Sequence, residues 1–287
     1  MKPRNKGLEP SYKIKCALRL ASAFSAGLLG VLFSIAFFLH FEPETSLFKA
    51  GSILIRITML LAVIISVILA VLTFALIRKT KAEEQVFPVE AEYKPYYKIE
   101  PVAIKTSRYV VAALIMGELA VKCFLVLRGK SQIFLSPFLS SVMLLLSIPL
   151  VLFFLPEVAN KLTPEYEKTH LFFGSFGLIR FLLEAVNIYF DNTVAYSSPY
   201  RILNQISLLL VMLMLVYEIK FHTDTPFTRA RLASLLAAFT LASSFTLGRV
   251  VMLISGKSVS VYDTATVFAM VGLSVYMGVK LYYYDED

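Results

Sequence analysis

Apolar residues are gathered into eight blocks along the chain, and each block is about as long as a helix that crosses a membrane. An α-helix rises 1.5 Å per residue, so about twenty apolar residues cross the ~30 Å hydrocarbon core of a bilayer. The pattern therefore predicts an all-α, polytopic transmembrane helical bundle of about eight helices, arranged as four hairpins. The expected helices cover residues 17–40, 52–77, 108–127, 133–155, 170–190, 201–220, 230–254 and 263–284.

The composition agrees with this prediction. Of the 287 residues, 57% are hydrophobic, whereas soluble domains average about 45–50%. The first apolar block is longer than the core of a typical signal peptide, and SIAFFLHFEP at its end contains no small-x-small cleavage site. We therefore expect this block to remain as an anchor, and residues 1–287 to form a single integral membrane domain.

Lysine and arginine are distributed unevenly between the two sets of connections, and this sets the expected orientation. Nineteen of them fall in the two termini and in segments 78–108, 156–169 and 220–231, against five in the remaining connections. Basic residues are retained on the cytoplasmic side, so we expect both termini in the cytoplasm and the protein in the plasma membrane (cytoplasmic membrane). Topology accounts for the net charge of +8, and we expect no nucleic acid partner.

The long connection between the second and third helices, residues 78–107, combines charges of both signs with three prolines and three tyrosines. Proline removes a backbone donor and clashes with the preceding turn, so three prolines at this spacing exclude one continuous helix. We interpret the segment as a cytoplasmic linker along the membrane surface. The alternative interpretation is a docking site for a membrane or cytoplasmic protein partner.

Four ionisable residues lie deep inside two of the expected helices. Glu118 and Lys122 are one turn apart on the third helix, and Arg180 and Glu184 are one turn apart on the fifth. A charge at the bilayer centre costs roughly 2.5–3.5 kcal/mol on insertion scales and therefore normally has a partner. The two helices run in the same direction, which predicts that Glu118 faces Arg180 and that Lys122 faces Glu184.

Further polar residues fall in the same outer half of the expected bundle, whereas the inner half is nearly free of charge. The sequence therefore predicts a polar cluster that opens outward and is closed below by an apolar plug. The candidate ligand-binding residues are Glu118, Lys122, Arg180, Glu184, Asn187, Arg249, Arg56 and Asp263.

Two interpretations of this cluster remain open. In the structural one, the charges specify how the helices pack, and Arg56 and Arg249 extend to the outer interface. In the functional one, the cluster binds a lipid headgroup or a small charged solute. Its basic residues outnumber its deep acids, which favours an anionic or zwitterionic ligand.

Short identities recur along the chain and indicate an internal repeat. A shift of 62 residues places SPF at 136–138 on SPY at 198–200, and it places Glu118 on Arg180. The letters RLAS occur at 19–22 and again at 231–234. These matches favour an ancestral duplication of one hairpin.

Small residues at helical spacing indicate where helices approach closely. Such stripes lie on the first helix (Ala23, Gly27, Gly30 and Ser34) and on the seventh (Ala233, Ala237, Thr240, Ser244 and Gly248). The two cysteines, Cys16 and Cys123, lie at different heights on their helices. Because a disulfide needs Cα atoms within about 7 Å, we expect two free thiols.

No catalytic or metal-binding motif is apparent. The three histidines lie at three separate helix ends, so no metal site is expected, and no GxSxG nucleophile motif occurs. We therefore expect no enzyme and no cofactor. The leading hypothesis is a membrane protein that binds or transports a small charged solute. The alternative is an accessory or sensory membrane module that acts through protein partners. Only Pro149 indicates the broken helix that transporters commonly contain.

The expected topology can be tested by cysteine labelling in intact cells. In a chain whose two native cysteines are replaced, a cysteine at Ala82 is expected to be protected from an impermeant thiol reagent. A cysteine at Ser197 is expected to react with the same reagent from outside. Labelling of both positions from outside would contradict the orientation derived from the basic residues.

Overall fold

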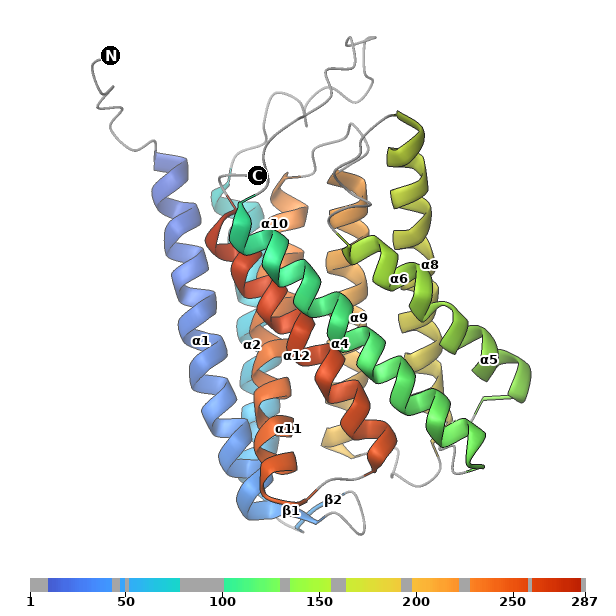
Figure 1. Cartoon of the computed structure of the whole chain (residues 1–287). Helices are drawn as coiled ribbons and strands as arrows, with labels where there is room; N and C mark the ends of the chain where they lie inside the picture. Colours follow the sequence, from blue (N-terminus) through green and yellow to red (C-terminus); the bar gives the residue numbers. More distant parts are fainter. Residues whose placement is uncertain are drawn as a thin grey trace.

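The computed structural model describes residues 10–42, 47–49, 52–77, 101–129, 135–155, 164–191, 198–221, 228–257 and 260–284. Within these residues, eight helical spans are long and apolar enough to cross a membrane. The predicted all-α, multi-pass class is therefore confirmed (Figure 1). The spans are formed by α1 (Pro10–His40), α2 (Ile53–Leu76), α4 (Val102–Leu127), α5 (Pro137–Leu145) with α6 (Ser147–Phe154), α8 (Pro164–Phe190), α9 (Pro199–Phe221), α10 (Thr228–Ala238) with a π-helical turn η1 (Phe239–Ser243) and α11 (Ser244–Ile254), and α12 (Val261–Tyr282).

Three helices begin a full turn or more before the residue that the apolar pattern predicts. They start at Pro10, Val102 and Pro164 instead of at residues 17, 108 and 170. Hydropathy marks only the part of a helix that lies in hydrocarbon, and a helix continues into polar sequence until its hydrogen bonding is interrupted. Residues 102–107 of the predicted linker therefore belong to α4, and its first part, 78–100, lies outside the described residues.

The helices of each predicted hairpin pack against each other: α1 with α2, α4 with α6, α8 with α9, and α11 with α12. The first hairpin is closed by two short antiparallel strands, β1 (Phe41–Glu42) and β2 (Leu47–Phe48). Helices distant in sequence also meet, as α12 packs on α4, α1 on α11, and α2 on α10.

The last two spans form the centre of the bundle. In their most apolar stretches 61% of the residues are buried inside the protein, against 22% for α2. Helix α2 is therefore peripheral and mostly faces lipid.

The N-terminal end of α1 and the C-terminal end of α12 lie on the same side of the bundle (Figure 1). The Arg19 guanidinium on α1 donates to the carbonyl of Leu281 on α12 at 3.2 Å, and the Lys15 ammonium lies 6.0 Å from the centre of the Tyr284 ring. We call this side the inner end and the opposite side the outer end, following the predicted topology. That the inner end is cytoplasmic stays a prediction from the distribution of basic residues.

Two spans are interrupted in the middle. The fourth breaks at Leu146, between α5 and α6, where the sequence predicted one helix over 133–155. Pro149 explains the break, because proline has no N–H to bond the carbonyl of Leu145 and its ring clashes with that carbonyl. In the seventh span, η1 widens one turn into a π-helix, a feature that often marks functional sites.

Only half of the small-residue stripe on α1 forms the predicted packing surface. Gly30 packs against Leu247, and Gly248 packs against Phe33 and Phe37, where an added Cβ would lie 2.8 Å from the Phe33 side chain. Ala23 and Gly27 are exposed instead. At this height α1 contacts the seventh span through the neighbouring face instead, where the buried Ser22 hydroxyl donates to the carbonyl of Leu236 at 3.3 Å.

An aromatic cluster covers the outer end of the bundle between α1, α9 and α11. The Phe37 ring lies 5.9 Å from the centres of both the Tyr200 and the Phe245 rings. All three side chains are buried. The two cysteines are both free, as predicted.

Candidate functional site

The predicted pairing of α4 with α8 is present in the structure. The Glu118 carboxylate lies 2.5 Å from the Arg180 guanidinium and 2.6 Å from the Lys122 ammonium. That ammonium also lies 2.9 Å from the Glu184 carboxylate. The four side chains, which we call the tetrad, thus form one chain of alternating charge. None of them is more than 3% exposed.

Helices α6 and α12 complete the surroundings of the tetrad. Arg180 donates from Nε to the hydroxyl of Ser147 at 3.1 Å, directly after the break in the fourth span. The Tyr262 hydroxyl donates to Glu184 at 3.2 Å, and the Lys122 ammonium lies 4.0 Å from the centre of the Tyr262 ring. That distance is typical of a cation–π contact. Four spans therefore meet at these charges.

A second ionic group lies next to the tetrad, closer to the outer end. Arg249 on α11 is fully buried, and its NH2 group lies 2.7 Å from Oδ1 of Asp263 on α12. Its NH1 group donates to the Asn204 side chain at 3.1 Å, and the Tyr200 hydroxyl donates to the second oxygen of Asp263. We call these four residues the Arg249 group, and together with the tetrad they form the outer cluster. Asp263 adjoins Tyr262 in the chain, so the two parts share α12.

The outer cluster is electrically balanced. The tetrad contains two acids and two bases, and the Arg249 group contains one of each. This corrects the predicted surplus of positive charge, because Arg56 does not belong to the cluster. Its side chain is exposed on α2, and among the described residues it has no ion pair with an acid. Balance is the expected condition at this depth, since an uncompensated buried charge costs several kcal/mol.

The other predicted residues lie where the sequence placed them. Asn187 is buried on α8, one turn beyond Glu184. Asp263 lies at the rim, with a side chain that is 13% exposed. All candidate residues except the exposed Arg56 are therefore enclosed in the outer part of the bundle.

Several polar atoms of this region are buried without a hydrogen-bond partner among the described residues. In the two ionic groups they are Oε2 of Glu118 and Nε of Arg249. The hydroxyls of Thr246 and Ser207 are also unpartnered, and each lies one turn inward of the Arg249–Asn204 contact on its own helix. Buried polar groups are normally satisfied by protein, water or ligand. The Arg249 group therefore retains hydrogen-bonding capacity that the protein itself does not use.

A third ionic group, which the sequence analysis missed, lies near the inner end. Glu218 on α9 is held by Arg231 on α10 at 3.1 Å and by Lys280 on α12 at 3.0 Å. The Tyr276 hydroxyl donates to the same carboxylate at 3.2 Å. We call these four residues the inner cluster, and all are buried. The prediction that the inner half is nearly free of charge is therefore wrong.

The reason for this error lies in the packing of helix ends. Glu218, Arg231 and Lys280 fall in the last or first turns of their expected helices, where side chains usually reach water. In the structure, α9, α10 and α12 cover one another at this end, so the three charges are enclosed. Only the spacing of Tyr276 and Lys280, one turn apart on one helix, pointed to a shared polar face.

An apolar layer separates the outer and inner clusters. On α12 the buried Met270 and Leu273 lie between Thr266, beside Glu184, and Tyr276 in the inner cluster. The ten-residue interval from Thr266 to Tyr276 corresponds to ~15 Å of helix between the two clusters. The predicted apolar plug is present, but as a layer between two charged groups instead of the whole inner half.

No protein family, curated protein or solved structure matches the chain. Within the described ranges, no three His, Cys, Asp or Glu side chains are grouped so that they hold a metal ion. The interpretation of the site therefore follows from its own geometry.

The coupling between α4 and α8 can be measured with a double-mutant cycle in detergent. Glu118→Gln and Arg180→Gln are each expected to lower the thermal unfolding temperature, because each leaves a buried charge uncompensated at a cost of about 3–5 kcal/mol. The double variant is expected to recover most of the loss, since Lys122 and Glu184 still neutralise each other. Glu118→Gln combined with Arg231→Gln is the control, and distant sites of this kind add within about 0.5 kcal/mol. Equal additivity in both cycles would contradict the pairing.

The inner cluster carries one acid against two bases, which predicts an asymmetry between its members. Glu218→Gln removes the carboxylate that Arg231, Lys280 and Tyr276 share, whereas Lys280→Gln leaves Glu218 paired with Arg231. We therefore expect the first variant to lower the unfolding temperature in detergent far more than the second. Equal losses, or a larger loss for Lys280→Gln, would show that Glu218 does not hold this group together.

Proposed function

We propose that this multi-pass membrane protein binds a small zwitterionic solute at the Arg249 group and moves it across the membrane. The single observation that carries the proposal is the state of Arg249, whose Nε is buried without a hydrogen-bond partner among the described residues, beside an acid at the rim. A guanidinium presents a planar fork of donors that matches a carboxylate. The carboxylate of the solute takes the place of Asp263 on this fork, and the cationic group of the solute faces the released Asp263.

Charge balance favours a zwitterion over an anion. The outer cluster is neutral among the described residues, so a bound anion adds an uncompensated buried charge. A zwitterion carries both signs and leaves the site neutral, which avoids the large cost of an unpaired ion in a medium of low dielectric constant.

The interrupted helices support a role for solute over a purely structural network. Transporters commonly bind substrates where a membrane helix is discontinuous, near the middle of the bilayer. In this chain Ser147 directly follows the break after Leu146, and its hydroxyl accepts a hydrogen bond from Arg180. The π-helical turn η1 ends three residues before Thr246. The first irregular segment therefore contacts the outer cluster through Ser147, and the second lies inward of Arg249 in the same span.

The inner cluster provides a second group of polar side chains on the far side of the apolar layer, as a route for a polar solute across the membrane requires. Transport then requires the apolar layer to open. The peripheral position of α2 is compatible with a movement of this helix relative to the bundle. In this proposal the protein is not an enzyme, resides in the cytoplasmic membrane and has both termini on the cytoplasmic side.

The proposal is tested by ligand-dependent thermal stability of the purified protein. The probes are glycine, glycine betaine and taurine as zwitterions, with acetate and ethanolamine as singly charged controls. A ligand at 100 times its Kd stabilises by about 2.7 kcal/mol, so a zwitterion is expected to raise the unfolding temperature and the singly charged probes are not.

Arg249→Lys is the informative variant, because it keeps the charge opposite Asp263 and removes the fork. It is expected to stay folded and to lose the shift caused by the zwitterion. Arg56→Lys is the matched control on an exposed arginine and is expected to behave as the native protein. A shift that persists in Arg249→Lys would disprove binding at this site. A protein that no probe stabilises would favour the accessory or sensory module.

A further inference from the structure

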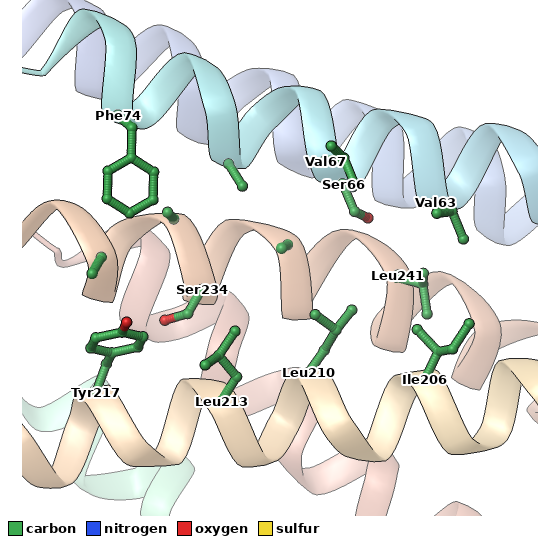
Figure 2. A pocket seen from close by; sticks show the side chains of 14 residues that line it. Val63, Ser66, Val67, Phe74, Ile206, Leu210, Leu213, Tyr217, Ser234 and Leu241 are labelled. Atoms are coloured by element: carbon green, nitrogen blue, oxygen red, sulfur yellow. The ribbon is translucent and has the colours of Figure 1, made fainter.

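An apolar crevice lies between α2, α9 and α10, away from the ionic clusters (Figure 2). Its volume is about 270 Å³. Figure 2 shows Phe74 and Val67 on α2 along one side and Tyr217 and Leu213 on α9 along the other. The ribbon of α10 lies between these two rows.

Small side chains on α10 create the space. Ala230, Ala233 and Ala237 face the crevice from this helix, and α2 and α9 each pack against α10 far more extensively than against each other. Alanine is too short to fill the gap between two such walls. A crevice at this position is therefore a direct result of the α10 sequence.

The crevice presents an apolar surface although two serines line it. The Ser66 hydroxyl donates to the carbonyl of Ala62 at 2.8 Å, and the Ser234 hydroxyl donates to the carbonyl of Arg231 at 2.9 Å. Both groups are thus satisfied within their own helices. A polar solute therefore finds little to bind here, whereas a hydrocarbon chain finds apolar side chains to contact.

The length of the crevice matches one leaflet of a bilayer. Its lining on α2 extends from Phe74, near the inner end, to Val63, and eleven residues of helix correspond to ~16 Å. On α9 the lining covers the same interval, from Tyr217 to Ile206. Half of a ~30 Å hydrocarbon core is ~15 Å, so the crevice runs from the inner interface to the midplane.

A basic residue marks the inner end of the crevice. Arg229, in the first turn of α10, donates to the carbonyls of Phe74 at 3.3 Å and Ile77 at 3.2 Å. Its side chain is half-buried, and the apolar span begins at this residue, so we expect its positive charge near the level of the lipid phosphates. Basic residues at this level attract anionic headgroups.

We propose that the crevice is a phospholipid site that takes one acyl chain of an inner-leaflet lipid, with the phosphate near Arg229. The chain fills the gap left by the alanines of α10 and braces the peripheral α2 against the bundle. This site shares no residue with the outer cluster, so its test is independent of the proposed transport function.

The test uses the purified full-length protein and phosphatidylglycerol that carries a photoreactive diazirine in the middle of one acyl chain. Crosslinked peptides are expected to come from the facing parts of α2, α9 and α10. Crosslinks distributed evenly over other lipid-facing positions, such as Phe24 on α1 and Ile57 on α2, would overturn the proposal. This measurement needs no variant, so it stays decisive even if substitutions in α10 impair folding.

Substitutions then locate the chain within the crevice. Ala233→Phe fills the middle of the crevice and is expected to abolish both the crosslink and the co-purified phospholipid seen by native mass spectrometry. Ala75→Phe, on the exposed face of α2, is the matched control and is expected to retain both. Retention of the lipid by Ala233→Phe would overturn the proposal.

The headgroup is tested separately. Arg229→Gln is expected to weaken retention of phosphatidylglycerol relative to phosphatidylethanolamine, because the anionic lipid loses its charge partner. A photoreactive free fatty acid is expected to label the crevice less than the phospholipid does. Equal labelling by the fatty acid, or unchanged lipid preference in Arg229→Gln, would overturn the assignment to a phospholipid.

Discussion

The central constraint on this fold is that hydrocarbon does not tolerate an unpaired charge. The Glu118 carboxylate satisfies it by forming ion pairs with Arg180 on α8 and with Lys122 on its own helix. Lys122 in turn pairs with Glu184. Because α6 packs against both α4 and α8, these pairs close a three-helix unit around Ser147. A shift or rotation of α4 or α8 by one residue leaves at least one charged side chain of the tetrad without its partner. The tetrad therefore specifies the register of α4 against α8.

The same constraint organises the molecule by depth. Charges occur in an outer cluster and in an inner cluster, and on α12 the buried Met270 and Leu273 separate them. Within the described helices, irregular geometry occurs at the break after Leu146, which contacts the outer cluster through Ser147, and at η1, which lies inward of Arg249 in the same span. A network that served only to hold helices together needs neither interruption. The coincidence of unpartnered polar atoms with interrupted helices is what favours binding of a solute over packing alone.

The periphery follows a different principle. Helix α2 is attached mainly through α1 and α10, and the alanines of α10 leave its contact with α9 open. In water such a crevice would expose apolar surface to the solvent. In a bilayer, the surrounding lipids supply acyl chains that fill it. A lipid at this position acts as part of the bundle. It also sets how firmly α2 is held, which links membrane composition to any movement of the helices around the apolar layer.

The sequence by itself determined the eight spans, their pairing into hairpins and the contacts of the tetrad. These depend on the 1.5 Å rise, on alternating direction and on the i, i+4 spacing of charges, and all three are local properties. Both interhelical pairs join residues 62 positions apart, the same offset as the proposed repeat. Only the tertiary structure decided that Arg249 binds Asp263, that Arg56 faces outward and that Glu218 is enclosed by Arg231 and Lys280. Those outcomes depend on how each helix is rotated and which neighbours cover its ends, and hydrophobic periodicity carries no information about either.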